Sequence, residues 1–140
     1  MYTMMLILLS ESYVSLGDLA AAVPLAHAAL ASAQERQERG FQGYALRLLG
    51  TLAAHGMVSD VGVAIRYYQQ AVALAQELGM RPLLAHSHCG LGILYSRLGQ
   101  RAPATAALST AVELYRAMAM VFWLPHAEQA LARVGQGQVD

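Results

Sequence analysis

The chain has 140 residues, the length of a single domain with one shared hydrophobic core. Its residues are 56% hydrophobic and 13% charged, which excludes intrinsic disorder, because disorder requires low hydrophobicity and high net charge. Nine arginines balance nine acidic residues, so no long-range field favours nucleic acid or an anionic membrane as a partner.

The first predicted helix, residues 2–15, is apolar around most of its circumference. A helix that caps a stack of helices normally keeps one polar face, so this one resembles an internal helix whose preceding repeat has been removed. We therefore expect an exposed apolar patch that a second copy of the chain covers in a homodimer. The patch comprises Met1, Met4, Met5 and Leu8.

The same segment does not fit a secretory signal, because it lacks a basic start and a small-residue cleavage site. No stretch of the chain approaches the roughly 20 apolar residues that a membrane span needs, so we expect no membrane partner. Cys89 is the only cysteine, which excludes an internal disulfide and favours a reducing, cytoplasmic compartment.

Six further helices are predicted near residues 19–39, 41–55, 60–78, 82–98, 101–119 and 123–134. Gly17 and Gly99 suit tight turns between helices, where a positive φ costs glycine little. Gly40 and Gly79 are expected directly after the ends of long helices. Pro24 falls inside the helix at 19–39, where it should kink the helix or delay its start.

Short blocks of sequence recur along these helices with a period of 40 or 42 residues. They are LSESY, LGTLA and LGILY at 9–13, 49–53 and 91–95, then ALASA, AVALA and AVELY at 29–33, 71–75 and 111–115, with Ala22, Ala64 and Ala104 as a third column. In each block of the first set a large apolar residue precedes a small one, which lets a partner helix approach closely. The sequence therefore predicts an all-α solenoid that forms a single domain over residues 1–140. Its three helical hairpins lie near 3–40, 43–81 and 85–120, and a capping helix follows at 123–134.

These blocks, the glycine turns and the paired alanines resemble the tetratricopeptide (TPR) repeat pattern, in a variety with longer helices. More specifically, the segments at 35–50, 77–100 and 109–128 resemble the C-terminal TPR region of large bacterial signalling ATPases and adenylate/guanylate cyclases. The resemblance implies a right-handed superhelix with a concave groove for a protein or peptide partner, without a cofactor. Because the chain has no GxxxxGK[ST] phosphate loop and no lysine, we expect a non-catalytic scaffold of a bacterial signalling system.

The TPR resemblance also implies which positions face the groove. By register these are Tyr44, Arg47, Thr51, His86, Cys89, Ile93, Ser96 and Arg97, with Met4, Ile7 and Glu11 in the first repeat. Two interpretations of Arg47 and Arg97 stay open: they hold a ligand carboxylate through paired N–H donors, or they are ordinary solvated charges. A second function class is a small-molecule sensor, which a well-formed pocket around Tyr44, Arg47 and His86 would favour.

His86 and Cys89 raise a third function class, a metalloprotein or a hydrolase. At positions i and i+3 of a helix they share one face, but a zinc site needs about four ligands, and a Cys–His nucleophile needs a third, orienting group. The sequence indicates neither, so we expect no metal and no catalytic residue. Phe122, Trp123 and Leu124 form the strongest aromatic cluster, which we expect to wedge the last helix onto the solenoid rather than to serve as an interface hot spot.

Overall fold

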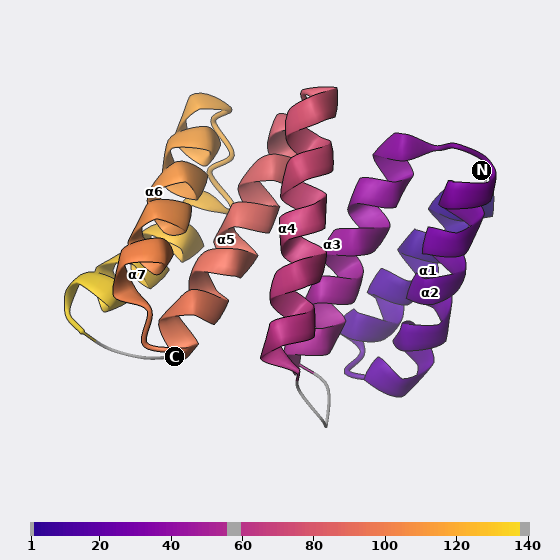
Figure 1. Ribbon diagram of the computed structural model, residues 1–140, viewed down its shortest axis with the longest axis horizontal. Helices are drawn as coiled ribbons and strands as arrows, with labels where there is room; N and C mark the ends of the chain where they lie inside the picture. The colour runs from indigo at the N-terminus through magenta and orange to yellow at the C-terminus, as the bar shows by residue number, and fades with distance from the viewer. Residues whose placement is uncertain (1, 56–59, 138–140) are drawn as a thin grey trace.

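The computed structural model describes residues 2–55 and 60–137, which form seven helices and no strand (Figure 1). The helices are α1 (Tyr2–Ser15), α2 (Leu19–Glu35), α3 (Arg39–His55), α4 (Val61–Leu78), α5 (Arg81–Arg97), α6 (Arg101–Ala117) and α7 (Leu124–Gly135). Within these ranges no helix has both the length and the apolar character that crossing a membrane requires.

Helices that follow each other in the chain pack side by side, so the molecule is a stack that runs from α1 and α2 to α6 and α7 (Figure 1). Helices α1, α3, α5 and α7 also contact one another in that order, whereas α2, α4 and α6 contact only their neighbours in sequence. The odd-numbered helices therefore form the closer-spaced, inner layer of a curved stack, and the even-numbered helices form the outer layer. This arrangement confirms the predicted all-α solenoid of TPR type.

The small residue of each recurring block lies where two helices of a hairpin approach most closely. Ser10 is fully buried, and its hydroxyl donates a hydrogen bond of 2.8 Å to a backbone carbonyl of α2. Gly50 faces the ring of Tyr68, and a Cβ on Gly92 would overlap the side chain of Leu108. The alanine columns are equally tight, with an exposed fraction of 0% for Ala22, Ala29, Ala64, Ala71, Ala104 and Ala111.

Three of the four glycines predicted to lie at helix ends have a positive φ: 81° at Gly17, 69° at Gly79 and 73° at Gly99. The prediction for Gly40 is wrong, because this residue lies inside α3 rather than after α2. Helix α2 ends at Glu35, since Gln37 adopts a φ of 56° and the N–H of Glu38 donates a hydrogen bond to the carbonyl of Ala33. A glutamine in this conformation gives no sequence signal, because the left-handed region normally selects glycine.

Pro24 does not delay the start of α2, contrary to one of the two predicted effects. The helix begins at Leu19, where the carboxylate of Asp18 accepts a hydrogen bond of 3.1 Å from the N–H of Ala21. The capped end fixes the first turn, and Pro24 follows in the second turn on the exposed side of the helix.

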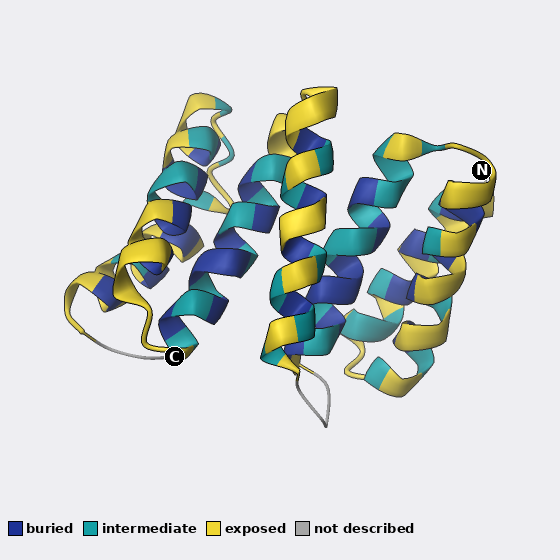
Figure 2. Ribbon diagram, in the orientation of Figure 1, coloured by how far each residue is buried: buried dark blue, intermediate teal, exposed yellow. Residues whose placement is uncertain are grey.

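The core runs between the two layers along the whole stack (Figure 2). Helices α3 and α5 have neighbours on both sides and are buried over most of their length, whereas α4 exposes its outer face. The inner layer therefore holds its helices firmly enough to present side chains of α1, α3 and α5 on one common surface.

Candidate partner-binding groove

A groove of about 520 Å³ opens on the inner layer, between α1, α3, α5 and the start of α7. It is lined by Glu11, Val14, Ser15, Tyr44, Arg47, Leu48, Thr51, Pro82, His86 and Trp123. The structure thus brings together Tyr44, Arg47, Thr51 and His86 from the predicted groove columns. Glu11 of the first repeat joins them on the opposite wall.

The other four predicted groove residues lie elsewhere on α5. Cys89 and Ser96 are buried, and each is 6% exposed. Ile93 packs against the core formed by α5, α6 and α7. Arg97 is half-buried and does not line the groove. Cys89 and Ile93 belong to the core that α5 shares with α6 and α7, so these register positions do not open into the described groove. Of the repeat-one positions, Ile7 is buried and Met4 is half-buried outside the groove.

Besides Trp123, four lining residues are not among the positions selected by register: Val14, Ser15, Leu48 and Pro82. Each lies three or four positions from a residue that the register did select, since Val14 and Ser15 follow Glu11, Leu48 follows Tyr44, and Pro82 precedes His86. Residues at these spacings share a helix face, so extending each column by one helical turn would have found them.

Arg47 supplies the positive charge of the groove. It is half-buried, and no acidic side chain of residues 2–55 or 60–137 forms an ion pair with it. Its backbone carbonyl accepts a hydrogen bond of 3.2 Å from the Thr51 hydroxyl, which also lies 2.8 Å from the hydroxyl of Tyr68. The floor beside Arg47 is therefore held in place by hydrogen bonds, while the guanidinium keeps its capacity to bind an anion.

His86 forms the wall of the groove together with an aromatic cluster. Its Nδ1 lies 2.6 Å from the hydroxyl of Tyr115, and its ring meets the edge of Trp123 at a centroid distance of 4.7 Å. Burial, and to a smaller extent the positive charge of Arg47, lower the pKa of His86 to about 4. At neutral pH His86 is therefore uncharged and contributes an aromatic surface rather than a second cation.

Trp123 contributes both to packing and to the groove. It contacts His86 and Phe122, lines the groove, and remains 39% exposed. Of its two neighbours in the cluster, Phe122 is 81% exposed and Leu124 packs against the core. The sequence leaves packing and binding as alternatives for this cluster. In the structure the indole packs against His86, and Trp123 also lines the groove with part of its surface exposed.

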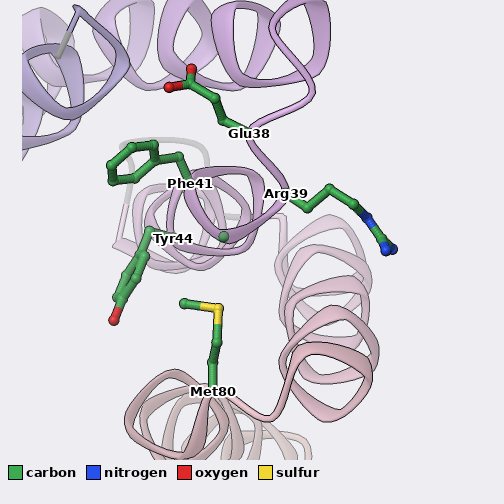
Figure 3. A pocket seen from close by; sticks show the side chains of 6 residues that line it. Glu38, Arg39, Phe41, Tyr44 and Met80 are labelled. Atoms are coloured by element: carbon green, nitrogen blue, oxygen red, sulfur yellow. The ribbon is translucent and has the colours of Figure 1, made fainter.

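A smaller apolar pocket of about 280 Å³ adjoins the groove at Tyr44, which lines both (Figure 3). Phe41 and Tyr44 project from the same side of α3, and Met80 reaches toward them from the start of α5 (Figure 3). Arg39 points away from this space and forms an ion pair of 2.6 Å with Glu77. The walls of the pocket are therefore mainly aromatic and thioether groups.

The repeat type is identified by comparison with known proteins. Residues 54–117, which include all of α4, α5 and α6, match the tetratricopeptide repeat family. This match supports TPR-like repeats in the segment from the end of α3 to the end of α6. Among curated proteins, no sequence matches it. The finer resemblance to the C-terminal region of bacterial signalling ATPases and cyclases stays a prediction.

Cys89 is unsuited to nucleophilic chemistry. Burial raises the pKa of its thiol to about 11, so the thiolate is scarce at neutral pH. In the part of the chain that the structure describes, no three His, Cys, Asp or Glu side chains are grouped so that they could hold a metal ion. Neither observation favours the third function class, a metalloprotein or hydrolase at His86 and Cys89.

The exposed face of α1, at the first end of the stack, forms a separate apolar surface. A depression of about 400 Å³ is lined by Tyr2, Met5, Leu6, Leu8, Leu9 and Ser12. Two residues of the predicted apolar patch, Met5 and Leu8, are 61% and 54% exposed there. Met4 is half-buried, and Met1 lies outside the described residues.

Proposed function

We propose that this TPR array is a non-catalytic interaction module that binds a protein or peptide partner in the groove of its inner layer. The observation that carries the proposal is Arg47, a half-buried cation without an ion-pair partner in the described chain, which lines the groove together with Tyr44 and Trp123. Arginine, tyrosine and tryptophan are the residues enriched at interface hot spots. TPR repeats generally mediate contacts between proteins, which agrees with this use of the groove.

Affinity capture from the native lysate tests the proposal. The wild-type chain is compared with Arg47→Ala, and with Arg66→Ala as a matched control, because Arg66 is an exposed arginine on the outer-layer helix α4. We expect a captured protein that Arg47→Ala loses and Arg66→Ala retains. Equal retention by both variants would place the partner away from the groove.

A small-molecule sensor is the second candidate, and one observation favours it. Tyr44, Arg47 and His86 line a single pocket of about 520 Å³, which is within the usual volume range of small-molecule sites. Trp123, the only tryptophan, lies on the same wall, so its fluorescence reports occupancy. A screen of small carboxylates that shifts Trp123 emission, without any groove-dependent protein capture, would favour the sensor over the interaction module.

The apolar face of α1 supports a proposal of self-association. Burying on the order of 500 Å² of apolar surface per subunit would contribute roughly 12 kcal/mol before the entropy of association is subtracted. We therefore expect a homodimer with a dissociation constant in the micromolar range or below. Light scattering across a concentration series measures the mass, and a monomer at about 100 μM would contradict this proposal.

The setting that we propose is the cytoplasm of a bacterium, within a signalling system. The support is the resemblance of residues 77–100 and 109–128 to the TPR region of signalling ATPases and cyclases, together with the unpaired thiol of Cys89. Fractionation of the native cells, with an antibody against the chain, tests the compartment. Recovery in the periplasm or the medium would contradict it.

A further inference from the structure

Three side chains of α3 connect the small apolar pocket to the groove. Phe41, Tyr44 and Arg47 follow one another at intervals of three residues, so Tyr44 lies between the other two around the helix and adjoins both. Phe41 and Tyr44 form the apolar pocket with Met80, and Tyr44 and Arg47 line the groove (Figure 3). The two cavities are therefore neighbouring parts of one surface along α3.

The charges around this surface are complementary to an acidic ligand group beside Arg47. Arg39 is engaged by Glu77, and the carboxylate of Glu38 accepts a hydrogen bond of 2.6 Å from the Thr3 hydroxyl. Both groups at the edge of the apolar pocket are thus satisfied. Glu11 lies across the groove on α1, and within the described ranges it forms no ion pair with Arg47.

The spacing along α3 suits an extended peptide. An α-helix rises about 1.5 Å per residue, so the middle of the Phe41–Tyr44 pair lies about 7 Å from the level of Arg47 along the axis. An extended chain rises about 3.3 Å per residue, and side chains two residues apart point to the same face. Two ligand side chains at positions i and i+2 therefore span about the same distance along the axis as the apolar pocket and Arg47.

We infer that this surface recognises an extended peptide segment with a large apolar side chain and, two residues away, an aspartate or glutamate. The apolar side chain enters the pocket of Phe41, Tyr44 and Met80, and the carboxylate pairs with Arg47. The inference rests on the proposed function, because it names the ligand chemistry of the same groove.

A random heptapeptide library displayed on phage, selected against the intact chain, tests the inference. We expect enrichment of sequences with an apolar residue and an acidic residue two positions apart. A fluorescent synthetic peptide from the selection is then titrated with four variants by anisotropy. Arg47→Gln should weaken its binding about tenfold or more, because a charge-assisted hydrogen bond is lost. The matched control Arg66→Gln, on the outer layer, should leave binding unchanged.

Gly40→Leu tests the apolar pocket without disturbing the fold. A Cβ on Gly40 would lie 3.6 Å from Cε and Sδ of Met80, which is ordinary van der Waals contact, so the larger side chain fills the pocket. The residue is helical, and leucine favours a helix more than glycine does. We expect this variant to fold as the wild type by circular dichroism and to bind the selected peptide at least tenfold more weakly.

Ser15→Trp separates failure of the inference from failure of the proposed function. Ser15 is exposed on the groove wall, so a tryptophan there obstructs the groove and leaves Arg47 and the residues of the apolar pocket unsubstituted. One outcome is a set of peptides that no longer bind Ser15→Trp but still bind Arg47→Gln and Gly40→Leu, and that lack an apolar and an acidic residue two positions apart. Such peptides would overturn the inference and keep the groove function. A selection with no peptide sensitive to Ser15→Trp would contradict both.

Discussion

At the scale of single residues, His86 shows how the groove shapes its own chemistry. Its ring is held between the Tyr115 hydroxyl and the edge of Trp123, and burial against these groups disfavours the imidazolium. Arg47 adds electrostatic repulsion to that effect. The groove thereby presents one cation beside a neutral ring, rather than two adjacent cations that would bind anions with less selectivity.

The depressed pKa of His86 predicts a loss of stability in acid. The unfolded residue protonates near pH 6.5 and the folded residue near pH 4, so between these values the unfolded state binds more protons. The free energy of unfolding should therefore fall as the pH is lowered from 6.5 to 4, by about 1–2 kcal/mol after allowance for solvent screening. Burial lowers the pKa of His55 and His88 as well, which acts in the same direction.

Urea unfolding at pH 7 and pH 4.5 measures this effect. His86→Gln keeps a polar group opposite Tyr115 but does not titrate, so its stability should change less between the two pH values than that of the wild type. The exposed His27 on α2 provides the control, and His27→Gln should keep the wild-type dependence. An equal pH dependence in wild type and His86→Gln would show that other groups cause it.

Cys89 should be unreactive until the chain unfolds. With a pKa of about 11, about one thiol in a thousand is ionised at pH 8, and the residue is only 6% exposed. Ellman's reagent should therefore modify the native protein far more slowly than the protein in concentrated urea. A native rate equal to that of a free thiol would mean that α5 exposes this side chain.

The sequence could predict half of the residues that line the groove, but not the contacts of its aromatic wall. Tyr44, Arg47 and Thr51 follow from the TPR resemblance, whose groove positions lie on one face of one helix. The contact of His86 with Trp123 depends on how the turn before α7 folds back onto α5, and no spacing in the sequence encodes that approach. Residues joined across separate elements require the packed structure.

At the scale of helices, small residues set how closely each hairpin packs. A Cβ on Gly92 would overlap the Leu108 side chain and lie 3.2 Å from the Leu108 backbone nitrogen, which has little freedom to move. Gly92→Ala should therefore lower the free energy of unfolding by about 1–3 kcal/mol, although alanine is the better helix former. Urea unfolding monitored by circular dichroism measures the change.

Gly40→Ala is the matched control for that prediction. It makes the same substitution in a helix whose neighbour, Met80, stands at a normal contact distance of 3.6 Å. Alanine should raise the stability there by up to about 1 kcal/mol, through its helix propensity. A loss of stability as large as that of Gly92→Ala would mean that helix packing does not distinguish the two sites.

The helices also show which features the sequence predicts, namely the hairpins, and which it does not, namely the junction of α2 and α3. The recurring large–small pairs predicted the hairpins because steric exclusion at Gly50 and Gly92 leaves few alternatives for those positions. The junction of α2 and α3 was placed wrongly because Gln37, rather than Gly40, adopts the left-handed conformation. Hydrogen bonds across the turn support that conformation locally, and a glutamine gives no prior indication of it.

At the scale of the whole molecule, the two ends of the stack differ in character. The outer face of α1 exposes Met5 and Leu8, together with Tyr2 and Leu9. Helix α7 buries Ala127, Ala130 and Val134 and leaves mainly polar residues exposed, among them Glu128, Gln129 and Arg133. Helix α7 therefore meets the requirement for a solenoid cap, whereas α1 presents a surface suited to a further partner.

This difference predicts a closed dimer rather than a growing chain of molecules. A filament would need apolar surface that matches α1 at the opposite end of the stack, and α7 does not offer it. Two copies that meet through the same face of α1 cover each other's apolar surface there. Light scattering should therefore show a mass that rises with concentration and levels off at twice that of the monomer.

Single charges at the two ends of the stack test this arrangement. Leu8→Glu places a carboxylate within the apolar face of α1, so we expect it to yield a monomer at concentrations where the wild type is dimeric. Val121→Glu is the control, because Val121 is 75% exposed but precedes α7 at the other end, and it should leave the dimer intact. If Val121→Glu yields a monomer and Leu8→Glu stays dimeric, the contact lies at the turn before α7 instead. A mass that never levels off with concentration would indicate head-to-tail association of unlike surfaces.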